Sequence, residues 1–197
     1  MWIDNKFIII KQILKNETGS LLDVGCRDQF LKQFLNEKLN YTGIDITQNF
    51  DKSNIIKDLN KELGIDENCF DIVTALDVIE HIEEPLIQIK KLLLICKNKL
   101  IINLPNISYY EKRIRFLYKG NLGDKYHFSG IKNEDRHHWF TNYISIMNFF
   151  QKNFHNYEII PVFKTRNKLK FLFFLEKYLY KFFPNLFSWS IIIIINK

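Results

Sequence analysis

The sequence of 197 residues predicts an α/β fold, in which helices cover both faces of a mostly parallel sheet. Short apolar runs that suit buried strands alternate with longer segments whose apolar residues recur at helical spacing. The run Leu21-Leu22-Asp23-Val24-Gly25 also indicates a strand that enters a tight turn at a glycine, and a helix start follows it. This is the opening of a strand–helix–strand unit.

The composition indicates a folded chain, because 47% of the residues are hydrophobic. The net charge of +6 is placed unevenly, since segment 163–197 holds seven basic residues and one acidic residue. The three cysteines, Cys26, Cys69 and Cys96, show no disulfide or zinc spacing, which favours a reducing compartment. We therefore expect a cytoplasmic protein with no signal peptide and no apolar stretch of the roughly 20 residues that a spanning helix needs.

The elements follow in order along the chain. A leading amphipathic helix is expected to end near Thr18-Gly19 and to cover the sheet edge, and a lid over a bound ligand is the alternative. Strands are expected at residues 41–46, 55–59, 70–76 and 99–104, and Pro85 begins a helix. The first crossover helix is predicted from the apolar residues Phe30, Leu31, Phe34 and Leu35.

Three motifs carry a resemblance to a known family. LLDVGC at 21–26, YTGID at 41–45 and FDIVTALDVIEHI at 70–82 resemble, in order and spacing, the successive motifs of class I S-adenosylmethionine-dependent methyltransferases. The resemblance implies a Rossmann-like three-layer α/β/α sandwich, whose mostly parallel seven-stranded sheet has an antiparallel C-terminal strand. Residues 157–163 and 190–196 would supply its last two strands.

The resemblance also implies one methyltransferase domain over residues 1–197. Its parts would be a cofactor-binding half at 18–106, an acceptor-side insertion at 107–140, and a basic aromatic helix with the last strand at 163–197. The cofactor would be S-adenosylmethionine.

The residues expected to bind this cofactor follow from their positions in the motifs. Asp45 ends the second strand, where an acidic residue can accept hydrogen bonds from both ribose hydroxyls. Asp58 resembles the family residue that contacts the adenine amino group. Arg27 and Gln29 stand where the family usually has glycines. The full expected set is Asp23, Gly25, Cys26, Asp45, Ile46, Asp58, Leu59, Leu76 and Asp77.

The insertion at 107–140 is expected to form the acceptor pocket, since long ordered loops usually carry function. A histidine can accept a proton from a hydroxyl nucleophile, and an aspartate can orient it. The candidate catalytic residues are His81, Asp135, His137 and His138. The alternative is structural, with His81 bonded inside its motif and residues 135–140 forming a turn before a helix that Thr141 caps.

We expect no metal from the sequence. Zinc at His127, His137 and His138 lacks the spacing of a fourth ligand. Asp77, Glu80 and His81 could hold a divalent cation, as in some ubiquinone-biosynthesis O-methyltransferases that the motif resembles, but this set is incomplete.

Residues 167–183 combine an apolar stripe with flanking lysines. Packing on the domain or in a homodimer is the main interpretation, and peripheral contact with an anionic membrane is the alternative.

The leading function is O-methylation of a small-molecule, glycan or lipid-linked acceptor. The other two interpretations are a non-catalytic or regulatory partner protein with this fold, and an RNA methyltransferase. Nucleic acid is disfavoured because the basic residues interleave with the apolar stripe.

Overall fold

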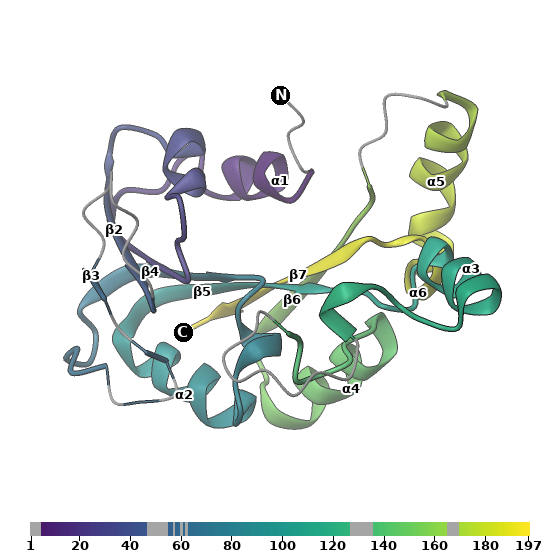
Figure 1. The fold of residues 1–197 in the computed structure, drawn as a ribbon. Coiled ribbons are helices and arrows are strands. Elements are labelled where there is room, and N and C mark those ends of the chain that lie inside the picture. The colour runs from purple at the N-terminus through teal and green to yellow at the C-terminus, as the bar shows by residue number, and fades with distance from the viewer. Residues whose placement is uncertain are drawn as a thin grey trace.

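The computed structural model describes residues 5–46, 55–56, 58–59, 61, 63–126, 136–164 and 170–197. Its centre is a seven-stranded sheet with the order β3-β2-β1-β4-β5-β7-β6 (Figure 1). Strand β7 runs antiparallel to both neighbours, and the other pairs are parallel. The predicted fold class is therefore confirmed. The strands are β1 Gly19–Val24, β2 Leu39–Asp45, β3 Ile55–Ile56, β4 Phe70–Leu76, β5 Cys96–Pro105, β6 Tyr157–Val162 and β7 Ser190–Asn196.

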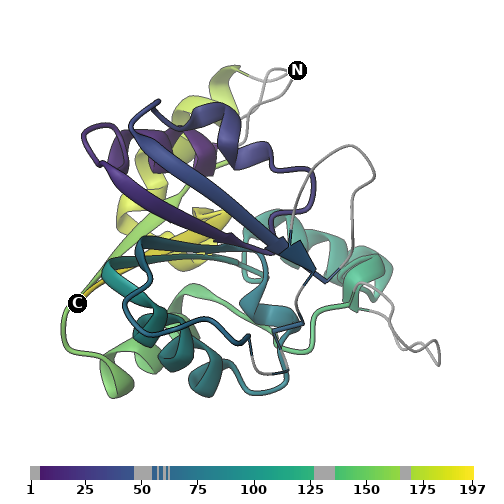
Figure 2. The same cartoon turned by 90° about the vertical axis from the view of Figure 1, so that its left-hand side faces the viewer.

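Helices cover both faces of the sheet, which gives three layers (Figures 1 and 2). Helices α1 and η1 lie on one face, and α2 and α4 lie on the other. Helices α3, α5 and α6 lie at one end (Figure 1). The bounds are α1 Asn5–Ile13, η1 Phe30–Phe34, η2 Ile79–His81, α2 Pro85–Ile95, α3 Tyr110–Lys119, η3 Asp124–Tyr126, α4 Tyr143–Asn153, α5 Lys170–Phe182 and α6 Pro184–Phe187.

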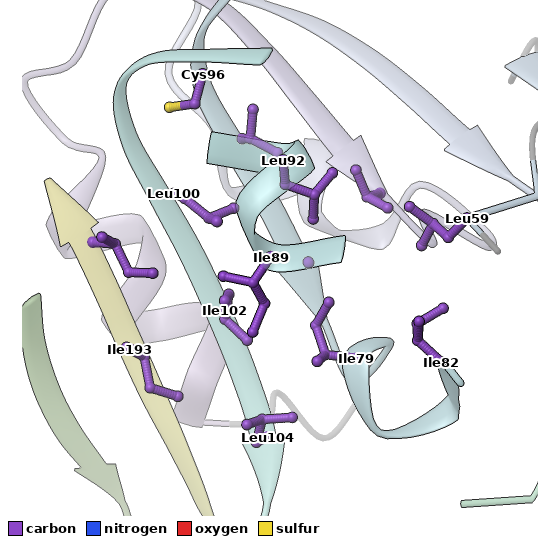
Figure 3. Close-up of a cluster of buried hydrophobic side chains, with 14 of the residues drawn as sticks. Leu59, Ile79, Ile82, Ile89, Leu92, Cys96, Leu100, Ile102, Leu104 and Ile193 are labelled. Carbon is purple, nitrogen blue, oxygen red and sulfur yellow. The ribbon is translucent and has the colours of Figure 1, made fainter. Parts of the chain in front are cut away.

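Two hydrophobic cores fill the spaces between these layers. In β7, Ile191, Ile193 and Ile195 face the core beneath α2 and α4, whereas Ile192 and Ile194 face the core beneath α1. This alternation is the two-residue period of a strand that is buried on both faces. Figure 3 shows the first core, where Ile89 and Leu92 of α2 lie against Leu100 and Ile102 of β5.

The first crossover is shorter than the sequence predicted. Only the 3-10 helix η1 forms, and Leu35 is already extended. The reason is Asn36, whose side-chain amide donates to the carbonyl oxygens of Leu14 at 2.8 Å and Glu17 at 3.1 Å. These bonds hold the chain extended and satisfy carbonyl groups beyond the end of α1. Helix α1 accordingly ends at Ile13, earlier than expected.

Two further expectations, one about a helix cap and one about the start of a strand, were wrong. Thr141 does not cap α4, because its hydroxyl donates to the carbonyl of Pro105 at 2.6 Å. Asn142 is the cap instead, and it forms a reciprocal capping box with Ser145. Strand β5 begins at Cys96, before the expected start at residue 99, because α2 ends at Ile95 with no intervening loop.

Among the residues that the structure describes, no helix has the length and apolar character needed to cross a membrane.

Candidate functional site

The turn after β1 follows a path that favours glycine at three positions. Gly25 has φ 70°, Arg27 has φ 44° and Gln29 has φ 55°, all in the left-handed region. A Cβ on Gly25 would lie 2.2 Å from Cγ2 of Val78. The close approach of the Val78 side chain favours glycine here, and the expected contact of Gly25 with the cofactor stays a prediction.

Asp45 fastens this turn to the neighbouring strand. Its carboxylate accepts a hydrogen bond from the backbone N–H of Arg27 at 2.9 Å. The end of β2 and the turn after β1 are therefore held together at the carboxyl edge of the sheet, where ligands of open α/β sheets bind. Ile46, the next residue, is exposed at the same edge.

Asp23 is buried inside the sheet and not on the open rim that the sequence suggested. Its two side-chain oxygens accept hydrogen bonds from the hydroxyls of Tyr41 and Thr74, each at 2.8 Å. Burial raises the pKa of Asp23 to about 6. Asp23 thus links β1 to β2 and β4, and its expected contact with the cofactor stays a prediction.

The other expected cofactor residues divide between core and rim. Cys26 is buried toward β2, with its Sγ 2.8 Å from the place where a Cβ on Gly43 would stand. Leu59 belongs to the core, and Leu76 is half-buried beside the second core. Asp58 lies near Lys61, with its Oδ2 at 3.9 Å from the Nζ.

Asp77 stands at the end of β4, where several groups fix its position. Its backbone is left-handed, with φ 56°, and its N–H donates to the carbonyl of Asn103 at 3.0 Å. Its carboxylate accepts bonds from the Asn103 amide and from the Lys6 ammonium of α1. Helix α1 therefore covers the sheet through Ile10 and also reaches this rim through Lys6. The sequence gave a place over a bound ligand only as the alternative for this helix.

Residues 136–139 of the insertion are fastened onto η2. The backbone N–H groups of His138 and Trp139 both donate to the carbonyl of Glu80, at 2.9 and 3.2 Å. The indole N–H of Trp139 donates to the carbonyl of Ile82 at 2.7 Å. The Nδ1 of His81 lies 2.7 Å from the carbonyl oxygen of Arg136. These contacts join the motif at 77–82 to the insertion.

The result is a cluster of Glu80, His81 and His137. The Nε2 atoms of both histidines lie 4.0 Å from Oε1 of Glu80, and the two rings meet edge to face at 4.6 Å. A carbonyl can only accept, so the neutral His81 ring carries its proton on Nδ1 and turns the lone pair of Nε2 toward Glu80. One ligand atom from each of the three residues lies within 4.8 Å of the others, so the cluster could hold a metal ion.

Glu80 is fully buried, and neither of its side-chain oxygens accepts a hydrogen bond from another described residue. Burial and the nearby Asp77 raise the pKa of Glu80 to about 8, against the lowering effect of Lys125 and Lys6. A buried carboxyl group in this state suits proton exchange near neutral pH.

Glu80 lies between two cavities. The first, of about 380 Å³, is polar, and Lys6, Asp77, Lys112, Lys125, Tyr126 and His137 are on its walls. The second, of about 450 Å³, is mostly apolar and lies between α2 and α4, beside Leu86, Trp139, Phe140 and Phe149. The sequence gave no signal for the lysines of the polar cavity, which come from α1, α3 and η3.

The four candidate catalytic residues have different places. His81 and His137 come together beside Glu80, and His137 is on the wall of the polar cavity. The side chain of His138 is exposed, and only its backbone bonds Glu80. Asp135 lies outside the described residues, as does His127.

Comparison with known proteins decides the family. A model of the methyltransferase domain matches residues 8–158, which is more than half of the chain. The chain belongs to the methyltransferase family. It is a methyltransferase that depends on S-adenosylmethionine as its cofactor. No curated protein sequence matches this methyltransferase.

Solved structures share the fold of this methyltransferase. An S-adenosylmethionine-dependent methyltransferase from Archaeoglobus fulgidus is 17% identical with a TM-score of 0.58, and the match covers 97% of this chain and 94% of that one. A Thermotoga maritima protein, described as a possible histamine N-methyltransferase, is 13% identical with a TM-score of 0.61, over 97% and 89% of the chains. The small RNA methyltransferase HEN1 is 18% identical with a TM-score of 0.62, over 98% of this chain and 25% of that one.

The residues at the carboxyl edge fit the cofactor. The left-handed turn at 25–29 and the acidic side chains of Asp45 and Asp77 lie at the ends of β1, β2 and β4. These groups would hold the cofactor, since backbone amides and carboxylates suit its amino acid and ribose parts. The polar cavity extends from Asp77 toward β5 and β7, with Asn103, Pro105 and Ser190 on its walls.

We predict that Gly25→Ala lowers stability more than Gly120→Ala. Both glycines are left-handed, with φ 70° and 64°, so both variants carry the same backbone penalty of about 1–2 kcal/mol. Only Gly25→Ala adds a clash with Val78, worth about 1–3 kcal/mol more, because nothing lies within 4 Å of the Gly120 position. Urea unfolding measures the difference. Val78→Ala should restore part of the loss in the Gly25→Ala protein, and equal losses at the two glycines would contradict the packing shown here.

We predict that Asp23→Asn stabilises the protein at neutral pH. The pKa of Asp23 is about 6 in the folded protein and 3.8 ordinarily. Proton binding to Asp23 therefore stabilises the folded state at low pH, and this stabilisation is lost as the pH rises through about 6. Asn resembles the protonated acid and should gain up to about 3 kcal/mol at pH 7, but only about 0.5 kcal/mol at pH 4. Chemical unfolding across this range measures the effect.

Asp71 provides a control of opposite sign. The backbone N–H and hydroxyl of Ser20 lower its pKa, so its contribution is present at neutral pH and is lost as the solution is acidified. Asp71→Asn should therefore destabilise at pH 7. A stabilising Asp71→Asn, or an Asp23→Asn effect independent of pH, would refute this assignment.

Proposed function

We propose that this methyltransferase methylates a hydroxyl group of an anionic or phosphate-bearing acceptor, such as a glycan or a lipid-linked intermediate, in the polar cavity. The observation that supports it most is the cluster of Glu80, His81 and His137 beside the end of β4. These side chains suit the removal of a proton from a hydroxyl, which an uncharged amine acceptor does not need before it reacts.

The chemistry divides between cofactor and protein. The cofactor supplies a methyl group made electrophilic by its sulfonium charge. The protein has to align the acceptor, exclude water and take up the hydroxyl proton. Glu80 and His137 are on the wall of the polar cavity and are the groups placed to take up this proton, and His81, whose tautomer the Arg136 carbonyl fixes, lies beside them.

The walls of the polar cavity indicate the acceptor class. Lys6, Lys112 and Lys125 place three ammonium groups around it, against the carboxyl groups of Asp77 and Glu80. Such a cavity favours an acceptor that carries phosphate or carboxylate beside its hydroxyl. The apolar cavity on the other side of Glu80 would suit a hydrocarbon part of the same acceptor.

RNA is the second candidate acceptor. The similarity to HEN1, a small RNA methyltransferase, and the basic residues of α3 beside the cavity favour it. It is weaker because that similarity is 18% in sequence and covers only a quarter of HEN1. A non-catalytic partner protein is the remaining alternative, and a measurement of methyl transfer by the protein distinguishes it from an enzyme.

We predict that cofactor binding and methyl transfer depend on different residues. Asp45→Ala should abolish calorimetric binding of S-adenosylhomocysteine. Glu80→Gln and His137→Ala should keep this binding but lower tritiated methyl transfer by about 10²–10⁴-fold, the usual effect of losing a general base. The acceptors are panels of sugar phosphates, phenols, polar lipids and short RNAs.

His138→Ala is the matched control, because its exposed side chain neighbours His137 in sequence but is not in the cluster. It should retain both activities. Transfer that survives Glu80→Gln and His137→Ala would refute the role of the cluster. Absence of S-adenosylhomocysteine binding by the folded wild-type protein would favour a non-catalytic role.

We also predict that the cluster binds a divalent cation, in contrast to the expectation from the sequence. A buried carboxylate and two imidazole nitrogens form a suitable donor set, and the carbonyl of Arg136 orients His81 as carbonyls orient metal-binding histidines. Chelator-treated protein should bind one Mn²⁺ in calorimetry, and His137→Ala but not His138→Ala should lose it. Wild-type protein that gives no Mn²⁺ binding would leave the cluster as a proton acceptor alone.

A further inference from the structure

Helices α3 and α5 lie at one end of the sheet (Figure 1). Both helices expose large apolar side chains. Helix α3 buries none of its residues, and Leu117 and Tyr118 are 78% and 81% exposed. In α5 and directly after it, Tyr178, Phe182 and Phe183 are exposed, Phe182 by 74%. Such a concentration of exposed apolar groups marks an interaction surface.

The two helices meet at this end of the protein. Glu176 of α5 is buried and accepts hydrogen bonds from the hydroxyls of Tyr109 and Tyr110, where α3 begins. The ring of Tyr110 also packs against Phe187 of α6, with the centroids 5.7 Å apart. The exposed residues of α3 and α5 therefore lie on neighbouring helices at the same end of the protein, which we call the aromatic-basic end.

The charge of this surface is of one sign. Among the side chains that the structure describes, α3 and α5 carry the basic residues Lys112, Arg113, Arg115, Lys119, Lys177 and Lys181 and only two acidic ones. Of these two, Glu176 is buried, and Glu111 is paired with Lys164 at 2.9 Å. The charge exposed by the two helices is therefore positive, next to leucine and aromatic side chains.

We propose that the aromatic-basic end docks on the surface of an anionic lipid bilayer. Helices that combine exposed apolar residues with lysine and arginine bind at the headgroup boundary, where the apolar groups enter and the cations meet lipid phosphate. The absence of a spanning helix among the described residues agrees with a peripheral attachment.

Two other occupants fit this surface less well. A second copy would bring two positive surfaces together, which like charges oppose. RNA would satisfy the cations, but protein–nucleic-acid interfaces are polar, and exposed Leu117 and Ile114 gain little against phosphate. A bilayer satisfies both components of the surface.

The position of the surface also bears on the acceptor. Lys112 of α3 lies on the wall of the polar cavity, so docking would hold this cavity near the headgroups. A lipid-linked acceptor could then reach the cluster without leaving the membrane. This last step depends on the proposed function, whereas the docking itself does not.

Vesicle sedimentation with the full chain tests the docking. The wild-type protein should sediment with vesicles of equal parts phosphatidylglycerol and phosphatidylcholine, but not with phosphatidylcholine alone, and less at high salt. The variant Leu117→Ser/Phe182→Ser should partition about tenfold less. The variant Lys119→Gln/Lys181→Gln should bind similarly weakly, since each cation near such a surface contributes about a tenfold factor or less.

Matched controls come from α2 on the opposite side of the sheet. Leu94→Ser, at a residue 48% exposed, and Lys91→Gln should leave vesicle binding unchanged. All variants should bind S-adenosylhomocysteine as the wild type does. A loss of vesicle binding in a variant can then be assigned to docking, because its cofactor site is intact.

Several outcomes would overturn the proposal. The wild-type protein could stay in solution with anionic vesicles, or the α2 variants could reduce sedimentation as strongly as the α3 and α5 variants. The wild-type protein could instead form a dimer in light scattering or bind single-stranded RNA tightly, and fail to bind vesicles. If the Leu117→Ser/Phe182→Ser variant then abolished the dimer or the RNA binding, the surface would be assigned to that partner.

Discussion

The candidate site depends on one backbone contact, in which the carbonyl of Glu80 accepts hydrogen bonds from the N–H groups of His138 and Trp139. This contact joins the loop after β4 to an insertion that follows β5. It fixes the backbone directly after His137, and the Trp139 indole bonded to the Ile82 carbonyl secures it further. The Arg136 carbonyl, which lies 2.7 Å from Nδ1 of His81, holds the backbone before His137. The distance from His137 to Glu80 is therefore set by main-chain geometry and not by two mobile side chains. Such support from a second layer of contacts is what catalytic and metal-binding groups need.

Much of the fold follows from local patterns in the sequence. Strand β4 has the predicted bounds, because its residues other than Asp71 and Thr74 are apolar and it lies between two strands of the sheet. Pro85 begins α2 as expected, since a helix does not need the N–H that proline lacks. The acidic residues Asp45 and Asp77 were predicted to lie at the carboxyl edge because each directly ends a parallel strand. The rule that parallel strands end at one edge needs no tertiary information.

What the sequence did not predict depends on partners far along the chain. The apolar residues of η1 suit a longer helix, but Asn36 binds carbonyl groups after α1 and ends it early. Asp23 resembles a rim acid in sequence, yet Tyr41 and Thr74 from neighbouring strands enclose it. The motif with His81 and the segment with His137 were both recognised as candidates. Their convergence on Glu80 was not predicted, because no local pattern records which loops meet.

Arg27 and Gln29 show how a departure from the family can leave a site's geometry intact. Both residues adopt left-handed angles that glycine would accept without strain, at a cost of about 1–2 kcal/mol each. The bond from the Arg27 N–H to Asp45 and that from the Gln29 N–H to the Cys26 carbonyl at 2.7 Å offset part of this cost. The Arg27 side chain is exposed and that of Gln29 is buried. At both positions the turn thus has the left-handed backbone that glycine would also adopt, so the replacements bear on stability and on the surroundings of the turn.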